Sequence, residues 1–521
     1  MGYLPKKSER PDGSLWPAIL VGIFASIGGI LFGYDTASIS GILTMNYWVD
    51  TMATTTDASG NPVITTTQTS LVVSILSVGT FVGALLAGPA GDCFGRRLGL
   101  VAACGVFITG VVLQTIAHAL PLFVVGRVVA GLGVGIVSAL VPLYQSESAP
   151  KWVRGTIVGC YQLCINLGLI LAACVNYSTG DRNNSGSYRV PVAIQILFGL
   201  ILAGGMLFLP ETPRYLLQVG KVEEAKASLS FLNSLPVDHP ALLQELREIE
   251  THVELERAEG VGYLSCWKSP ILKRQLTGCA LQALQQLSGI NFIIYYGTRF
   301  FRTVGIEDAF LATIIVNVVA FVSTIPGLYL VERMGRRNLL LIGAAGMAIS
   351  QLILAVLGIT VTSTAGQNAL IAVVCIYIFF FEFSWGPCAW VVTGEMFPVH
   401  VRAKALSMTT ASNWLWNFIL GFITPYMVDS GKGNADLGSK VFFIWMAFCL
   451  LAVAFVWNFI YETKGLSLEQ VDELYQQCSK AYKSPSFRRT WDFEGAVASA
   501  GSQSDRKDGD EMHEVSVSAK E

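Results

Sequence analysis

Long apolar segments limit what this chain can fold into. Twelve of them have about 20 residues or more, the length that a helix needs to cross the hydrocarbon core of a bilayer. Six lie before residue 210 and six after residue 275, at 17–43, 71–90, 98–117, 121–143, 156–175, 190–209, 276–298, 309–330, 338–360, 369–392, 405–428 and 441–460. Only 14% of the residues are charged, too few for an ordinary soluble surface. We therefore predict an all-α integral membrane protein with twelve transmembrane helices.

The loops between these segments differ in charge. Lys and Arg gather in alternate loops, at 91–97, 144–155, 211–275, 331–337 and 400–404. The loops at 44–70 and 361–368 contain neither residue type. Because cytoplasmic loops are enriched in Lys and Arg, we expect both termini in the cytoplasm. The polar N-terminus does not resemble a cleavable signal.

Three motifs occur twice in the same order, which indicates two related halves. DCFGRR at 92–97 is similar to ERMGRR at 332–337, and PETPR at 210–214 to YETKG at 461–465. Glu147, Pro150 and Arg154 recur as Glu395, Pro398 and Arg402. Duplicated bundles are common among transporters. We predict a short N-terminal segment, a first bundle, a linker with short helices, a second bundle and a tail that is largely disordered at its end, at 1–16, 17–213, 214–272, 273–461 and 462–521 respectively.

These motifs, together with GRVVAGLGVG, PLYQSESAPKWVRG, QQLSGIN and GEMFPVHVRAKA, resemble the sugar porters of the major facilitator superfamily, in particular the fungal hexose transporters. The similarity extends from about residue 17 to about residue 470. It implies the major facilitator fold, with two pseudo-symmetric six-helix bundles, and transport of a monosaccharide by alternating access. The second PETPR-like motif departs from the family pattern, because it begins with Tyr461 instead of Pro.

Amide side chains inside the apolar segments are the candidates for sugar binding. A sugar hydroxyl donates and accepts hydrogen bonds, and Gln and Asn match both roles without burying a charge. Where many relatives have Asn in the eighth helix, this chain has Ala320, and Asn317 lies three residues earlier. The alternative for each amide is a hydrogen bond between helices. By resemblance, and with Asn317 added, the sugar site comprises Gln162, Gln285, Gln286, Asn291, Asn317, Trp390 and Asn413.

Two helix irregularities are predicted beside these amides. Ser288-Gly289 follows Gln286 and is expected to loosen the seventh helix. Gly386-Pro387 precedes Trp390 and is expected to let the tenth helix bend. Glu382, in the same tenth segment, is an intramembrane carboxylate that we assign to conformational coupling between helices.

Asp35 is a carboxylate in the first apolar segment, within LFGYDTASISG. A charge at the centre of a bilayer costs about 2.5–3.5 kcal/mol on insertion scales, so it normally pairs or takes up a proton. The expected partner is Arg127, at the start of GRVVAGLGVG. In the proton-coupled sugar porters this pair couples proton binding to transport, which makes Asp35 the proton candidate. The alternative is a fixed structural ion pair.

Charged side chains at the predicted cytoplasmic helix ends form a candidate gating network. Ion pairs between these helices would stabilise one gate closed, and rocking of the bundles would break them. The alternative is that the arginines only reflect the positive-inside rule. The network comprises Arg96, Arg97, Glu147, Arg154, Arg333, Arg336, Arg337, Glu395 and Arg402.

Tyr295 and Tyr296 are expected either to form the extracellular gate or to be ordinary interfacial aromatics. Asn176 and Asn183 begin glycosylation sequons in the predicted external loop before the sixth helix.

The resemblance, together with Asp35, predicts a plasma-membrane transporter of a monosaccharide, glucose or another hexose with xylose as a further candidate, coupled to protons. Its expected partners are the sugar, protons and the lipid bilayer, with no nucleic acid. A facilitator without proton coupling is the first alternative. A transporter-like glucose sensor is the second, although such sensors have longer tails than this one. No nucleotide loop, metal cluster or nucleophile–base arrangement is found in the sequence, so we expect no enzyme, no cofactor and no metal.

Overall fold

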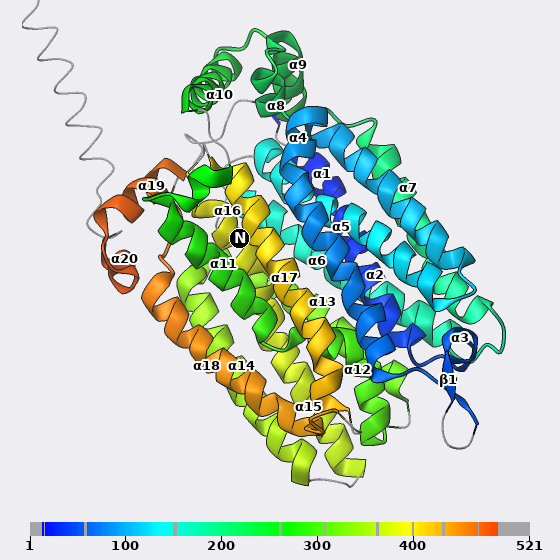
Figure 1. The fold of residues 1–521 in the computed structure, drawn as a ribbon. Helices are drawn as coiled ribbons and strands as arrows, with labels where there is room; N and C mark the ends of the chain where they lie inside the picture. The colour runs from blue at the N-terminus through cyan, green and yellow to red at the C-terminus, as the bar shows by residue number, and fades with distance from the viewer. Residues whose placement is uncertain are drawn as a thin grey trace, which may run out of the picture.

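The computed structural model is a bundle of long helices (Figure 1). It describes residues 13–14, 16–56, 60–149, 154–259, 263–306, 308–360, 364–398, 401–429, 433–466 and 468–487. The end of the tail, predicted to be disordered, lies outside these residues.

The first half contains five long helices, one of them long enough for two spans. A two-residue antiparallel hairpin, β1 (Thr55–Thr56) with β2 (Pro62–Val63), lies between α3 and α4. The helices are α1 (Trp16–Ala25), α2 (Ile27–Ile42), α3 (Asn46–Met52), α4 (Thr66–Ile116), α5 (Leu120–Ser148), α6 (Arg154–Thr179) and α7 (Gly186–Met206).

The second half follows three short helices and one 3-10 turn of the linker. These are α8 (Pro213–Gln218), α9 (Val222–Asn233), α10 (Pro240–Glu259) and η1 (Tyr263–Trp267). The second half comprises α11 (Ile271–Leu287), α12 (Ile290–Val304), α13 (Ala309–Met334), α14 (Arg336–Thr360), α15 (Thr364–Phe380), the π-helical turn η2 (Phe381–Trp385), α16 (Gly386–Glu395), α17 (Arg402–Val428), η4 (Gly438–Lys440) and α18 (Val441–Phe459). The tail adds α19 (Leu468–Gln477), η5 (Ala481–Lys483) and α20 (Ser484–Phe487).

All twelve predicted spans are helical. Nine helical stretches within the described residues are long and apolar enough to cross a membrane. The 51 residues of α4 contain two predicted spans, which meet at a non-helical Gly95. The other two predicted spans are α11 with α12, and α17. The first is divided into two helices of 17 and 15 residues, and α11 contains four Gln residues. The second contains Asn413, Asn417 and several Ser and Thr residues.

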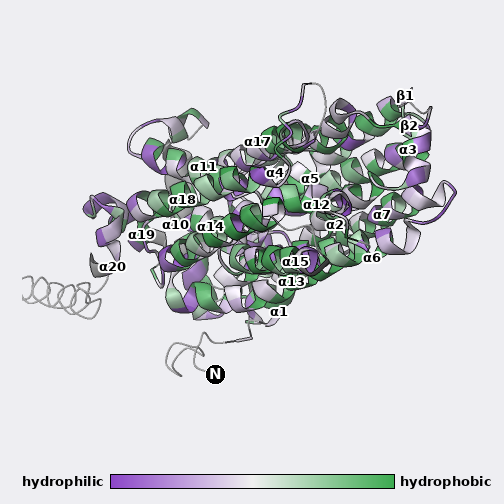
Figure 2. Ribbon diagram, turned by 90° about the horizontal axis from the view of Figure 1, so that it is seen from below, coloured by the Kyte–Doolittle hydropathy of each residue, from purple (hydrophilic) through white to green (hydrophobic). Residues whose placement is uncertain are grey.

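The surface of the bundle matches a lipid environment. Hydrophobic residues cover much of the long helices, and hydrophilic residues gather at the ends of the bundle and on α19 (Figure 2). Large apolar side chains are exposed on several spans, including Leu20, Leu200, Val322 and Ile349. In water such exposure would be costly, whereas in a bilayer it is expected.

The duplicated Gly-Arg-Arg motifs fold in the same way in both halves. We call residues 95–97 and 335–337 the Gly-Arg-Arg turns and the end of the bundle that carries them the turn end. Glu211 accepts the backbone N–H groups of Arg96 and Arg97, at 3.2 and 3.0 Å. Glu462 does the same for Arg336 and Arg337, at 3.0 and 3.2 Å. Each carboxylate thereby satisfies N–H groups at the start of a helix, where negative charge is favourable.

Glycine is required at both turns because the carboxylate lies against the backbone. Gly95 has φ 83° and Gly335 has φ 92°, a region that other residues rarely adopt. A Cβ atom at either position would collide with Glu211 or Glu462. Tyr461, the departure from the family motif, takes no part in these bonds and donates its hydroxyl to the carbonyl of Cys478 at 3.0 Å.

One sequence prediction about the loops is wrong. Asn176 lies within α6 rather than in an external loop, is 2% exposed, and donates to the carbonyl of Ser38 at 3.1 Å. An amide engaged in this way is not available for glycosylation. Asn183 is exposed, between α6 and α7.

We predict that Gly335→Ala lowers the melting temperature of the detergent-solubilised protein. The substitution forces a residue with a side chain into the left-handed region, which costs on the order of 1–3 kcal/mol, and displaces Glu462. Gly105→Ala on α4 is the control, because a Cβ there meets nothing within 4 Å. Equal melting temperatures for the two variants would contradict this account of the turn.

Candidate functional site

A cluster of buried amide side chains lies between α11, α12 and α17. Asn413 donates to Gln282 and Gln285 at 2.7 and 2.8 Å and accepts from Gln286 at 2.7 Å. Asn291 donates to the side-chain oxygen of Gln286. All five residues are at most 8% exposed. The structure therefore brings four predicted sugar ligands into one network and adds Gln282, which the sequence analysis missed.

The break between α11 and α12 allows this network to form. The helix stops at Ser288 and resumes after Gly289, which has φ 89°. The carbonyl of Ser288, freed by the break, accepts from Gln351 and from Tyr377, each at 3.0 Å. The loosening predicted at Ser288-Gly289 is thus present, and its unpaired backbone acceptor is satisfied by neighbouring helices.

The remaining sugar-site candidates lie around this network. Trp390 is half-buried on α16. Asn317 of α13 donates to the carbonyl of Leu169 on α6, at 3.2 Å. Gln162 of α6 donates to Glu382 at 3.2 Å. Asn317 and Gln162 therefore bond across the boundary between the two halves rather than joining the amide network.

Glu382 lies in the π-helical turn that directly precedes Gly386-Pro387. A π-turn inserts one extra residue into a helical turn and is often found at functional sites. The Glu382 carboxylate is 2% exposed. Besides Gln162, it accepts from Asn166 at 2.8 Å and from Thr324 at 3.3 Å. Neither Asn166 nor Thr324 was identified from the sequence.

Asp35 and Arg127 are brought together in the first half, on α2 and α5. The nearest oxygen and nitrogen are 3.9 Å apart, and the side chains are 0% and 1% exposed. Both carboxylate oxygens of Asp35 and two guanidinium nitrogens of Arg127, Nε and Nη2, lack a hydrogen-bond partner in the structure. A buried ion pair with unfilled hydrogen-bonding positions is costly, since desolvation is only partly repaid by Coulomb attraction.

Tyr295 and Tyr296 lie inside the bundle and are 1% and 4% exposed. Tyr295 donates to Asn417 of α17 at 3.0 Å, and Ser77 of α4 donates to the same oxygen at 2.7 Å. Tyr296 donates to the carbonyl of Gly421 at 2.7 Å. Tyr295 therefore takes part in a contact between the halves through Asn417, which fits a gate better than an interfacial aromatic.

The two halves touch toward both ends of the bundle. At the end that carries β1 and β2, Ser40 and Thr298 are 3.2 Å apart and Arg302 donates to the carbonyl of Thr44 at 2.9 Å. Toward the turn end, Ser407 donates to the carbonyl of Ala84 at 2.7 Å. The amide network thus lies between two sets of contacts.

The candidate gating residues form one similar cluster in each half. Arg96 bonds to Glu147 at 3.0 Å, and Arg336 bonds to Glu395 at 2.8 Å. Thr212 and Thr463 donate to the same two carboxylates. These ion pairs connect helices within a half, not between halves. Glu211 and Glu462 complete the clusters; their place in a repeated motif was the signal that could have identified them.

Four further gating candidates bond to or stack on groups other than the carboxylates of Glu147 and Glu395. Arg97 and Arg337 donate to the carbonyls of Leu207 and Trp457. Arg402 donates to the carbonyl of Phe397 at 3.0 Å. Arg333 stacks on Tyr329, with 5.6 Å between the guanidinium carbon and the ring centre. Arg154 begins α6, but its side chain lies outside the described part of the structure.

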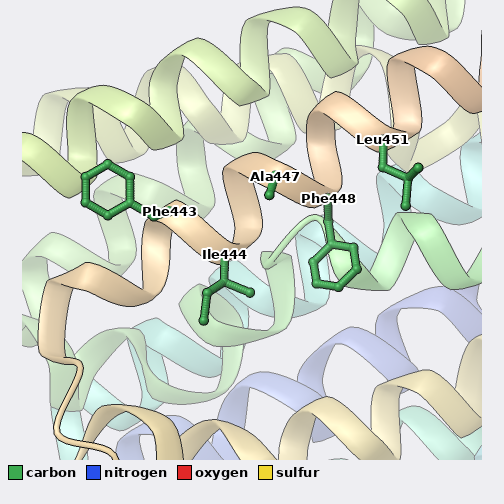
Figure 3. A pocket seen from close by; sticks show the side chains of 5 residues that line it. All are labelled: Phe443, Ile444, Ala447, Phe448 and Leu451. Carbon is green, nitrogen blue, oxygen red and sulfur yellow. The ribbon is translucent and has the colours of Figure 1, made fainter.

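A metal site and a hollow on α18 are the alternatives to the amide network. Within the described residues, no group of three or more His, Cys, Asp or Glu side chains could hold a metal ion. A shallow hollow on α18 is lined by Phe443, Ile444, Ala447, Phe448 and Leu451 (Figure 3). Its lining offers no polar side chain that could orient a sugar, so the amide network is the stronger candidate.

The chain matches the family model described as "Sugar (and other) transporter" over residues 21–475. It belongs to this sugar transporter family. The transporter is 54% identical to the major facilitator-type transporter ecdD of Aspergillus rugulosus, over 97% of this chain and 96% of the relative. It is 49% identical to the probable glucose transporter rco-3 of Neurospora crassa, over 95% of this chain and 85% of the relative.

A solved structure supports the same fold. The proton:xylose symporter XylE of E. coli, bound to 6-bromo-6-deoxy-D-glucose, superposes with a TM-score of 0.76 at 29% identity, covering 88% of this chain and 99% of the other. The transporter therefore has the major facilitator fold and is a multi-pass membrane protein, as the sequence predicted. The relatives named here are transporters and not enzymes.

We predict that Asn413→Leu raises the sugar concentration for half-maximal uptake by at least about tenfold. Leucine can neither donate to nor accept from a sugar hydroxyl, and a polar group of the sugar that is left unpaired in a buried site costs about 1–3 kcal/mol. Asn458→Leu, at an exposed position on α18, serves as the control. An unchanged half-saturation concentration for Asn413→Leu would remove the amide network from the sugar site.

Proposed function

We propose that this transporter carries a monosaccharide of the glucose or xylose type across the plasma membrane together with a proton, by alternating access. Both termini face the cytoplasm in this proposal, because the loops richest in Lys and Arg then lie inside. The amides of the C-terminal half bind the sugar hydroxyls, and Asp35 binds the proton. The names of the similar proteins, a probable glucose transporter and a proton:xylose symporter, support both parts of the proposal.

The observation that carries the proposal is the buried Asp35–Arg127 pair. At 3.9 Å, the pair lacks the close hydrogen bonds that make a buried salt bridge stable. A carboxylate that is fully buried and incompletely bonded gains little from staying ionised. Small movements of Arg127 or of water can therefore change which protonation state is favoured, as a coupling site requires.

The sugar would bind within the amide network by exchanging amide–amide bonds for amide–hydroxyl bonds. Gln285, Gln286, Asn291 and Asn413 are buried and mutually bonded, so a sugar must replace each bond that it breaks. Hydroxyl groups donate and accept, so they can do this at little net cost. A ligand without hydroxyls would leave the amides unsatisfied and would be rejected.

The gating role of the turn-end clusters is part of the proposal. Because the ion pairs of Arg96 and Arg336 lie within the halves, they would stiffen each half as a rigid body. The contacts that break during rocking would be those between the halves, such as Ser407 with Ala84. Charged clusters that fix helix ends suit a rigid-body mechanism.

A facilitator without proton coupling is the second candidate, and one observation favours it. Asp35 and Arg127 belong to α2 and α5 of the same half. Rocking of one half against the other does not by itself separate them. A pair that stays together throughout the cycle would be structural, and the sugar would cross alone.

We predict that Asp35→Asn abolishes accumulation of labelled glucose in cells that lack their own hexose carriers. The asparagine cannot take up a proton, so uptake should only equilibrate and should no longer respond to external pH or to a protonophore. Asp50→Asn, at an exposed carboxylate of the same half, should keep the wild-type pH response. Wild-type uptake that merely equilibrates would favour the facilitator, and sugar binding without uptake would favour a sensor.

A further inference from the structure

Glu382 is a buried carboxylate with no cation beside it among the described residues. In the part of the chain that the structure describes, it makes hydrogen bonds but no ion pair. Three donors lie within reach of one oxygen, Oε2: Asn166 at 2.8 Å, Gln162 at 3.2 Å and Thr324 at 3.3 Å. The single hydrogen of the Thr324 hydroxyl is shared with the carbonyl of Ala320, at 2.9 Å. Because a buried charge without a counter-ion depends on its hydrogen bonds, these donors determine whether the carboxylate is tolerated.

The donors come from both halves of the transporter. Gln162 and Asn166 lie one turn apart on α6, in the first half, whereas Thr324 lies on α13 and Glu382 on η2, in the second. Asn166 also donates to the hydroxyl of Thr324 at 2.7 Å. Its side chain is 0% exposed. The amide of Asn166 therefore bonds to both the Glu382 carboxylate and the Thr324 hydroxyl of the second half.

Gln162 faces two demands that compete for one amide. In the structure its Nε2 donates to Glu382, and a sugar that bonds to both the nitrogen and the oxygen of this amide would have to turn it away from the carboxylate. Of the two amide donors, Gln162 makes the longer bond and Asn166 the shorter. If Gln162 leaves, Glu382 still keeps Asn166 and Thr324.

We propose that Asn166 is a positioning residue for sugar binding: it keeps Glu382 hydrogen-bonded so that Gln162 is released to the sugar. The inference rests on the proposed function, because it takes Gln162 as a sugar ligand. Without Asn166, Gln162 would be the only amide donor left to the carboxylate. Sugar binding would then remove the last amide donor from the buried Glu382 carboxylate. Because this costs free energy, sugar affinity would fall.

The experiment is a double-mutant cycle on the full-length, purified transporter. Glucose binding is measured by calorimetry, and KM and kcat by uptake into proteoliposomes, for wild type, Asn166→Leu, Glu382→Gln and the double variant. We expect Asn166→Leu to raise Kd and KM about tenfold, the size expected for a lost hydrogen bond to a charged group, with a smaller change in kcat. In the Glu382→Gln background the same change should raise Kd less than twofold, because a neutral amide does not depend on two donors.

Asn176→Leu is the matched control. Asn176 is a buried Asn on the same helix, but it donates to carbonyl groups of α2 in its own half. The effect of Asn176→Leu on Kd should be the same with Glu or Gln at position 382. Melting temperatures identify variants that fail to fold, and Asn166→Ala replaces Asn166→Leu in that case.

Two results would overturn the inference while leaving the proposed function intact. In one, wild type binds glucose and Asn166→Leu does not change Kd. In the other, Asn166→Leu raises Kd equally in both backgrounds, which would make Asn166 a direct sugar ligand or a packing residue. If wild type binds neither glucose nor xylose, the proposed function itself has failed, and the role of Asn166 fails with it.

Discussion

The absence of water from the bilayer core is the constraint on which the rest of this structure depends. Every polar group placed there must find its partner within the protein. The Ser288 carbonyl illustrates this, because the break after α11 is tolerated only where Gln351 and Tyr377 fill its free acceptor. The amide network follows the same rule, because its Gln and Asn side chains bond to one another. In the proposed function, the hydrogen bonds between these side chains are exchanged for hydrogen bonds to sugar hydroxyls.

The duplication of the chain is retained at the turn end and lost in the interior. Glu211 and Glu462 make the same pair of backbone bonds in the two halves. In the interior, the first half contributes the Asp35–Arg127 pair and the second half contributes the amides. Symmetry is retained at the helix ends, where both halves use the same carboxylate, and it is lost in the interior, where the halves carry different polar side chains. Gln162 and Asn166 on α6 of the first half donate hydrogen bonds to the Glu382 carboxylate of the second half.

Most of the fold could be predicted from the sequence, because the length of an apolar segment and the charge of a loop are properties of neighbouring residues. The spans, the break at Gly289 and the closeness of Asp35 to Arg127 all follow from residue type and motif. Asn166, Thr324, Gln282 and Asn417 could not be found in this way, because a single polar residue in an apolar helix does not indicate its partner. Asn176 shows the reverse error: its sequon suggested a loop, but its amide is used to join α6 to α2. Partners separated by more than a hundred residues are set by helix packing, which local patterns do not record.

In the proposed symport, the position of the Asp35–Arg127 pair limits how coupling would work. Because Asp35 and Arg127 lie in one half, a signal from the sugar must reach them through an element of the other half that touches α2. α12 is such an element, since Thr298 meets Ser40 of α2. α12 also begins at the break that follows Gln285 and Gln286, so it can tilt relative to α11 when those amides turn to a sugar. Coupling by this route would need a hinge inside one bundle in addition to rigid rocking, and the break at Gly289, with φ 89°, is where α12 could move.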